Sequence, residues 1–344
     1  MTITVLILLI GLSAANGSND VPKAVATLAG AGVTKFRTAI LWGTATTLVG
    51  CLISLQLAGK MTALFSTGIV AASPSAAFTA AVLLGTASWV VLATILRLPV
   101  STTHALVGAL IGAGVLFAAS SVQWSALLPK VVLPLLLSVV VAYVLSLGLA
   151  LLSRVVSSPP RSGRRAHGPG AATAAEMAPE GQQTSGTPSA VDRVLGVAHW
   201  VTSGFACAAR GLNDTPKIVA IGAFALVPAG WRPWQILLVV TAAMAAGSLV
   251  GGLRVAERLA NDVVTMNHRE GFSANLTTAA LVGLGAGAGL PMSTTHVSTG
   301  AIAGSAGKDV GRINAKTIRG FAIAWVVTPP FAGLVAAGAY ALIQ

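Results

Sequence analysis

Long apolar stretches separated by short polar segments recur along the whole chain. Five of them cover Ala39 to Ala58, Ala76 to Leu96, Val131 to Leu152, Ile236 to Leu253 and Phe321 to Ile343. Each is close to the roughly 20 residues that a helix needs to cross a hydrocarbon core of ~30 Å. They lack the alternation of apolar and polar residues that barrel strands show. The pattern therefore predicts an all-α polytopic membrane protein whose first membrane segment lies in the apolar N-terminal stretch.

Composition and charge support a membrane protein and argue against other classes. Of the 344 residues, 55% are hydrophobic and only 9% are charged, whereas soluble domains contain about 25% charged residues. The net charge of +12 could indicate nucleic-acid binding. However, the basic residues are dispersed at the ends of apolar segments and form no stripe interleaved with aromatic residues. We therefore expect the lipid bilayer, and no nucleic acid, as a partner.

One segment, residues 157–190, has a different composition from the rest. It is rich in Pro, Gly, Ser, Ala and Gln, which is typical of a flexible linker. This linker divides the chain, so we predict a first membrane repeat over 1–156 and a second over 191–344. Three arginines within it, Arg161, Arg164 and Arg165, place it on the cytoplasmic side of the plasma or inner membrane by the positive-inside rule.

The two halves are related in sequence. AANGSNDVPKAVA around Asp20 matches AARGLNDTPKIVA around Asp214 at nine of thirteen positions, with an offset of 194. Further along, LPVSTTHALVGALIG matches LPMSTTHVSTGAIAG with an offset of 192. Two motifs in the same order at nearly the same spacing indicate an internal duplication.

The first motif places a carboxylate in an apolar segment of each half. An ionised Asp at membrane depth costs several kcal/mol unless it is paired, protonated or bound to an ion. Asp20 and Asp214 could simply pair with Lys23 and Lys217. Pro22 and Pro216 follow at once and are expected to interrupt both helices. Interrupted helices at matching positions of two repeats are typical of a transporter's binding site.

The second motif, P-x-S-T-T-H, combines a helix start with three hydroxyls. Ser101 and Ser293 are suited to cap the following helices, whose N-termini favour anions. The alternative is that the hydroxyls only satisfy backbone groups in packed helices. His104 and His296 could contact a ligand, carry a proton or form structural hydrogen bonds.

Together, the paired G-x-N-D and P-x-S-T-T-H motifs resemble the PiT family of inorganic phosphate transporters over essentially both halves. The resemblance implies two inverted repeats with broken helices and re-entrant helical hairpins, and symport of phosphate with sodium or protons. The substrate-binding residues that it implies are Asn19, Asp20, Ser101, Thr102, Thr103, Asn213, Asp214, Ser293, Thr294 and Thr295. It also implies that Asp20 and Asp214 bind the cation, and that Ser273 lies nearby, in a stretch like the family's second hairpin entrance. Independently of the resemblance, Lys23 and Lys217 are expected to compensate charge, and His104 and His296 to lie around the site. No cofactor or metal is expected beyond a bound sodium ion.

The chain also departs from that family at one point. After N-D the family usually continues with small residues and Asn, but here Pro22 and Lys23 follow. An ammonium at this position could replace a bound cation. A phosphate dianion beside two aspartates would be repelled in a low dielectric, so cations, protons or the lysines must offset the charge.

Three other functions and the oligomeric state stay open from the sequence alone. A sulfate permease of the same fold would use the same hydroxyls. An enzyme using Ser101 or Ser293 with a histidine would need one asymmetric set of catalytic groups, and two equivalent copies argue against it. A receptor or scaffold would not explain aspartates within the membrane. A homodimer is one option for the assembly.

Overall fold

The computed structural model describes residues 1–156, 190–262, 266–307 and 309–344, which are almost entirely helical. The first half contains α1 (Thr2–Asp20), α2 (Pro22–Gly30), α3 (Phe36–Leu57), α4 (Gly59–Ala63), η1 (Leu64–Gly68), α5 (Ala76–Ile95), α6 (Thr102–Ala118), η2 (Ala119–Ser121), α7 (Trp124–Leu127), η3 (Leu128–Val132) and α8 (Leu133–Val156). The second half contains α9 (Ala190–Leu226), α10 (Pro233–Asp262), α11 (His268–Ala288), α12 (Thr294–Ser305), η4 (Val310–Arg312) and α13 (Ala315–Ile343). The predicted linker lies outside the described residues, apart from Ala190.

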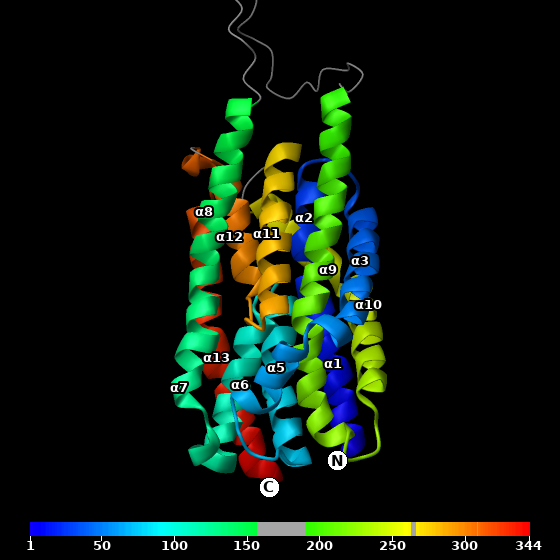
Figure 1. The fold of residues 1–344 in the computed structure, drawn as a ribbon, viewed down its shortest axis with the longest axis vertical. Coiled ribbons are helices and arrows are strands. Elements are labelled where there is room, and N and C mark those ends of the chain that lie inside the picture. The colour runs from blue at the N-terminus through cyan, green and yellow to red at the C-terminus, as the bar shows by residue number, and fades with distance from the viewer. Residues whose placement is uncertain (157–189, 263–265, 308) are drawn as a thin grey trace, which may run out of the picture.

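Equivalent helices of the two halves run in opposite directions along the long axis (Figure 1). α1 runs away from the end marked N, and its counterpart α9 runs toward that end. The connections that follow the two N-D motifs, residues 31–35 and 227–232, consequently lie at opposite ends of the molecule. This arrangement agrees with the inverted repeats expected from the sequence.

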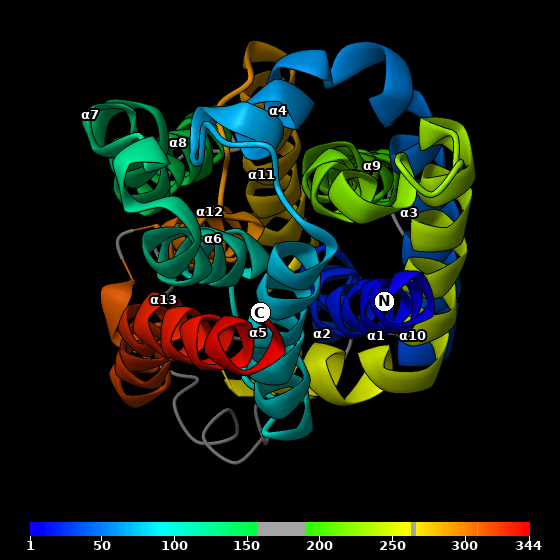
Figure 2. The same ribbon diagram turned by 90° about the horizontal axis from the view of Figure 1, so that it is seen from below.

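The two halves are interleaved, as the end-on view in Figure 2 shows. α1 packs on α10 and its counterpart α9 packs on α3. In the same way α6 packs on α13, and its counterpart α12 packs on α8. Each of these pairs joins one repeat to the other, so the repeats form a single helical body in the described part of the chain.

Glycines that follow both copies of the second motif at the same position make this close packing possible. A Cβ atom on Gly108 of α6 would lie 2.2 Å from the carbonyl oxygen of Pro329 on α13. A Cβ on the equivalent Gly300 of α12 would lie 2.3 Å from the carbonyl oxygen of Val139 on α8. Small residues let helix backbones approach within a membrane, which explains the repetition of these glycines.

Replacing either glycine by alanine should destabilise the protein. We expect Gly108→Ala and Gly300→Ala each to cost about 1–3 kcal/mol, because the added methyl group pushes two backbones apart. Gly148→Ala on α8 is the matched control, since a Cβ there meets nothing within 4 Å. Thermal unfolding in detergent measures the difference. Equal melting temperatures for all three variants would show that these contacts do not limit packing.

The outer surface suits a bilayer. In the described residues, seven helical segments are long and apolar enough to cross a membrane. Large apolar side chains face outward on them: Val250, Leu334 and Leu342 are 88%, 75% and 89% exposed. α9, the counterpart of the first span, is not among the seven, and it carries Arg210, Asp214 and Lys217 within its length. The chain is therefore a multi-pass membrane protein with its polar groups inside.

Two helical hairpins enter this bundle from opposite ends. α5 and α6 form one hairpin, and α11 and α12 form the other (Figure 1). Their tips, residues 96–101 and 289–293, approach the middle of the long axis. Arg97 and the equivalent Gly289 both adopt positive φ, at 57° and 79°, to reverse the chain. The two helical hairpins expected from the sequence are thus present.

Candidate functional site

The hairpin tips bring both copies of both motifs together. The N-D-x-P-K segments lie on α1–α2 and on α9, and the S-T-T-H segments begin α6 and α12. Hydrogen bonds connect these four segments across the two halves. Chain positions 274 residues apart, Asp20 and Thr294, therefore share one buried cluster.

Lys23 binds three oxygen atoms of different kinds. Its Nζ donates to Asp20 Oδ1 at 2.6 Å, to the carbonyl oxygen of Val100 at 2.8 Å and to Thr295 Oγ1 at 2.6 Å. The side chain is only 1% exposed. Asp20 lies three residues earlier, one helical turn away, which explains the local ion pair. Of the other two oxygens, that of Val100 lies in the tip of the first hairpin and that of Thr295 in the first turn of α12, in the second hairpin.

Lys217 repeats this arrangement in the other half. Its Nζ donates to Thr103 Oγ1 at 2.7 Å, to Asp214 Oδ1 at 3.2 Å and to the carbonyl oxygen of Met292 at 3.4 Å. Thr103 and Met292 are the repeat counterparts of the threonine and the carbonyl that bind Lys23. The cluster therefore has an approximate two-fold symmetry, in which each lysine contacts both hairpins.

The two asparagines of the first motif hold the hairpin tips. Asn19 Nδ2 donates to the carbonyl oxygen of Leu98 at 2.9 Å, and Asn19 Oδ1 accepts from the backbone N–H of Val100 at 3.0 Å. Asn213 Nδ2 donates to the carbonyl oxygen of Met292 at 3.1 Å. Both amide side chains therefore bind the irregular backbone that precedes a helix start.

The hydroxyl residues of the second motif occupy two kinds of position. Ser101 and Ser293 cap α6 and α12, accepting from the backbone N–H of the histidine three residues later, as predicted. Thr294 Oγ1 donates to Asp20 Oδ1 at 2.7 Å, and Thr102 Oγ1 donates to Asn16 Oδ1. All six hydroxyl residues are buried and lie at the two helix N-termini that the hairpins bring together.

Arg210 is a buried cation of the cluster that sequence reasoning missed. Its guanidinium lies 3.5 Å from Asp20 Oδ2 and contacts the Ser298 hydroxyl on α12. Its Nε and the Nδ2 of its repeat counterpart, Asn16, have no hydrogen-bond partner in the described part of the chain. The alignment of the repeats could have revealed it, because arginine in an apolar segment replaces asparagine at an otherwise matching position.

Other predicted residues lie beside the cluster. The rings of His104 and His296 are 4.7 Å apart, and His296 Nδ1 is 2.9 Å from the carbonyl oxygen of Leu135. Trp325 packs on His296, with ring centroids 4.1 Å apart. Ser273 is buried on α11, where no hydrogen bond between described residues joins it to Asp20 or Asp214.

The expected break in the helix is present in only one half. In the first half α1 ends at Asp20 and α2 begins at Pro22. In the second half the prediction is wrong, because α9 continues through Pro216. α9 packs on α3, α10 and α11, and this packing supports the helix, so loss of one backbone donor at Pro216 does not end it. The helix N-termini at the site are therefore those of α6 and α12, at the hairpin tips, and not ends within α9.

The charges of the cluster favour an anion. Asp20 and Asp214 face Lys23, Lys217 and Arg210. These five side chains carry one more positive than negative charge, and the neighbouring histidines add none when they are neutral. The N-termini of α6 and α12 add partial positive charge and backbone donors. In a buried, low-dielectric site this excess attracts a negatively charged ligand strongly.

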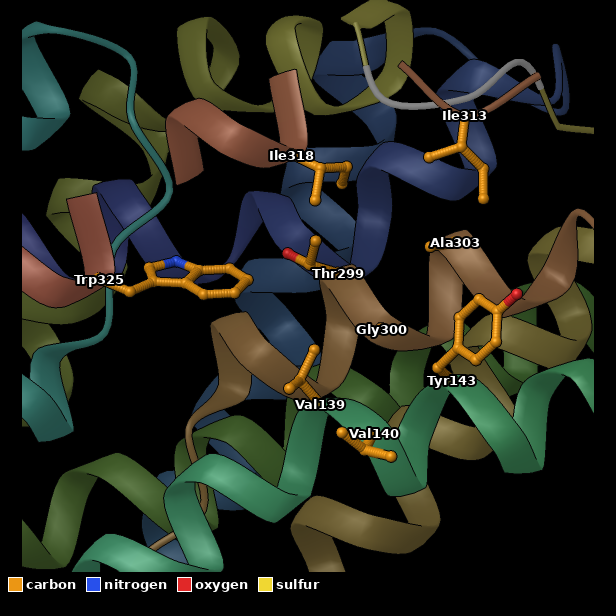
Figure 3. Close-up of a pocket in the computed structure, with 9 residues that line it drawn as sticks. All are labelled: Val139, Val140, Tyr143, Thr299, Gly300, Ala303, Ile313, Ile318 and Trp325. Carbon is orange, nitrogen blue, oxygen red and sulfur yellow. The ribbon is translucent and has the colours of Figure 1, made fainter. Parts of the chain in front are cut away.

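A separate apolar pocket lies beside α12, and Figure 3 shows the residues that line it. Its volume is about 370 Å³. It is lined by residues of α8 and α12, by α13 and by the segment just before α13: Val139, Val140, Tyr143, Thr299, Gly300, Ala303, Ile313, Ile318 and Trp325. With almost no polar groups, this pocket does not suit an oxyanion, and it is distinct from the charged cluster.

Comparisons with known proteins agree with this geometry. The model of the "Phosphate transporter family" matches residues 16–336. A relative from Rhizobium meliloti, named "probable low-affinity inorganic phosphate transporter", is 28% identical over 94% of this chain and 91% of its own length. A Mycobacterium bovis relative with the same name is 28% identical over 96% of this chain and 74% of its own length. A solved structure of "the sodium-dependent phosphate transporter" has a TM-score of 0.82 at 20% identity, covering 99% of this chain and 98% of that one, which shows a common fold.

Proposed function

Because the chain belongs to the phosphate transporter family, we propose that it is a secondary active transporter that carries inorganic phosphate, in symport with a cation, across the cell membrane. In this proposal the anion binds between the hairpin tips. The observation that carries it is the buried cluster in which two helix N-termini, six hydroxyl residues and an excess of cationic side chains converge. Family membership argues against an enzyme, and no comparison favours sulfate.

The proposed transport is tested by uptake of radiolabelled phosphate into proteoliposomes that contain the purified protein. An imposed sodium or proton gradient should drive accumulation above the level in empty liposomes, and the effective gradient identifies the coupling cation. Excess unlabelled phosphate should compete and excess sulfate should not. Equal competition by sulfate would indicate a sulfate permease instead.

The proposed orientation places the linker end of the molecule in the cytoplasm of a plasma or inner membrane. Basic residues gather where α3, α11 and α13 begin: Lys35, Arg37, Arg269, Arg312, Lys316 and Arg319. At the opposite end, near η3 and before α10, the described residues include Lys130 and Arg232. This bias supports the orientation by the positive-inside rule.

Sidedness can be tested with single cysteines. The native Cys51 and Cys207 are buried, so cysteines introduced in place of Lys35 and Arg232 can be labelled with little background. We expect an impermeant thiol reagent added to intact cells to label the Arg232 position and not the Lys35 position, because the two connections lie at opposite ends. Labelling of both positions from outside would contradict the inverted arrangement.

Removing hydroxyls at the helix starts should weaken phosphate binding in a graded manner. We expect a single change, Thr102→Ala or Thr294→Ala, to cost about 0.5–3 kcal/mol, because one donor is lost while the backbone donors remain. This corresponds to a few-fold to ~100-fold in affinity. Matched pairs, such as Ser101→Ala with Ser293→Ala, should cost more.

Calorimetry on purified variants measures this affinity. Thr299→Ala is the matched control, because Thr299 lies on α12 but lines the apolar pocket. If the hydroxyls serve only to satisfy backbone groups, the alanine variants will lose thermal stability and keep the affinity of the control.

A further inference from the structure

Both lysines of the cluster have the surroundings of a bound metal cation. Each ammonium contacts one carboxylate oxygen, one backbone carbonyl oxygen and one threonine hydroxyl. Hard cations bind in proteins through oxygen ligands of these same three types. For Lys23 the three oxygens lie at 2.6–2.8 Å, and for Lys217 they lie at 2.7–3.4 Å. The oxygens at these two positions are therefore already used by fixed positive charges.

A sodium ion does not fit beside these ammonium groups. An ion bound to the oxygens around Lys23 Nζ would lie only a few ångströms from that ammonium. Two like charges about 4 Å apart repel by ~4 kcal/mol even at an effective dielectric of 20, and the site is almost fully buried.

The charge balance of the cluster also needs no sodium. Lys23, Lys217 and Arg210 outnumber Asp20 and Asp214 by one charge. A singly charged oxyanion, such as the dihydrogen form of phosphate, would make the loaded site neutral. A sodium ion in addition would restore an uncompensated buried charge, which is costly.

We propose that Lys23 and Lys217 act as built-in cations at the two positions where a symported metal ion would bind, so that this chain binds phosphate without sodium. The inference rests on the proposed function, since it concerns the anion of the same site. It assigns to both lysines a specificity-determining role in the choice of the co-transported cation.

The wild-type protein gives the first test. Phosphate binding is measured by calorimetry in sodium chloride and in choline chloride at the same ionic strength and pH. We expect equal affinities within about twofold. A requirement for sodium would overturn the inference and leave the proposed function intact, whereas absence of phosphate binding in both salts would refute the proposed function itself.

Two substitutions at Lys23 distinguish a built-in cation from a structural contact. Lys23→Asn shortens the side chain and frees the oxygens around Nζ. It should weaken binding in choline by about tenfold or more, as expected for a lost charge in a buried site, and sodium should restore part of the loss. Lys23→Met fills the same volume without a charge and should weaken binding equally, with no recovery in sodium.

Lys130→Gln is the control, because Lys130 is exposed in η3, at the end of the molecule opposite the linker. It should leave the affinity unchanged in both salts. Unchanged affinity of Lys23→Asn in choline would overturn the inference. If the Lys23 variants do not fold, the inference is decided by the phosphate affinities of the wild-type protein in sodium chloride and in choline chloride.

Discussion

Replacing Asp20 by asparagine is expected to reduce phosphate uptake to near background and to destabilise the protein more than the same change at Asp214. Asp20 neutralises two buried cations, Lys23 at 2.6 Å and Arg210 at 3.5 Å, and accepts a hydrogen bond from Thr294. Breaking a buried ion pair by removing one partner costs about 3–5 kcal/mol, because the other charge stays buried and unpaired.

Asp214→Asn should also stop uptake but cost less stability. Among the described residues, Asp214 forms one ion pair, with Lys217 at 3.2 Å, and accepts from Asn213 at 2.8 Å. Uptake by proteoliposomes and thermal unfolding in detergent measure the two effects separately. Glu257→Gln is the control, because Glu257 is an exposed carboxylate on α10. Normal uptake by either aspartate variant would exclude its carboxylate from the transport cycle.

Replacing Arg210 by glutamine should cause the largest loss of phosphate affinity of any single change in the cluster. Arg210 supplies the positive charge by which the cationic side chains exceed the carboxylates, and its Nε has no hydrogen-bond partner among the described residues. Truncating a buried, hydrogen-bonded charge typically costs 2–5 kcal/mol or more. We therefore expect the affinity to fall by about 100-fold or more.

Two further variants show whether charge or packing causes this loss. Arg210→Lys keeps the positive charge and should recover part of the affinity, although it loses the planar fork of donors. Arg232→Gln removes an exposed arginine near the opposite end of the molecule from the linker and should have no effect. If Arg210→Gln lowers the melting temperature but binds phosphate normally, Arg210 is only a structural partner of Asp20.

The helices and the relation between the halves could be predicted from the sequence because both follow from local patterns. The apolar stretches correspond to α3, α5, α8, α10 and α13, and the repeated motifs correspond to equivalent positions in two antiparallel copies. The N-caps at Ser101 and Ser293 were also predictable, since capping depends on residues three positions apart.

Contacts between distant segments could not be predicted in this way. The spacing of Asp20 and Lys23 indicates an ion pair on one helical turn, but it does not show that Thr295 completes the surroundings of the ammonium. That contact depends on the crossing of two hairpins from different repeats. Pro216 illustrates the same limit, because packing around α9 overrides the local tendency of proline to end a helix.

The most direct measurement is the position of a bound anion. Arsenate is a tetrahedral oxyanion like phosphate, and its anomalous scattering locates it in a crystal without ambiguity. We predict one arsenic peak between the N-termini of α6 and α12, placed so that the arsenate oxygens lie within about 3 Å of donors such as Arg210, Thr102 or Thr294. A protein that binds arsenate with phosphate-competitive affinity but shows its peak elsewhere, with none between the hairpin tips, would contradict the proposed site.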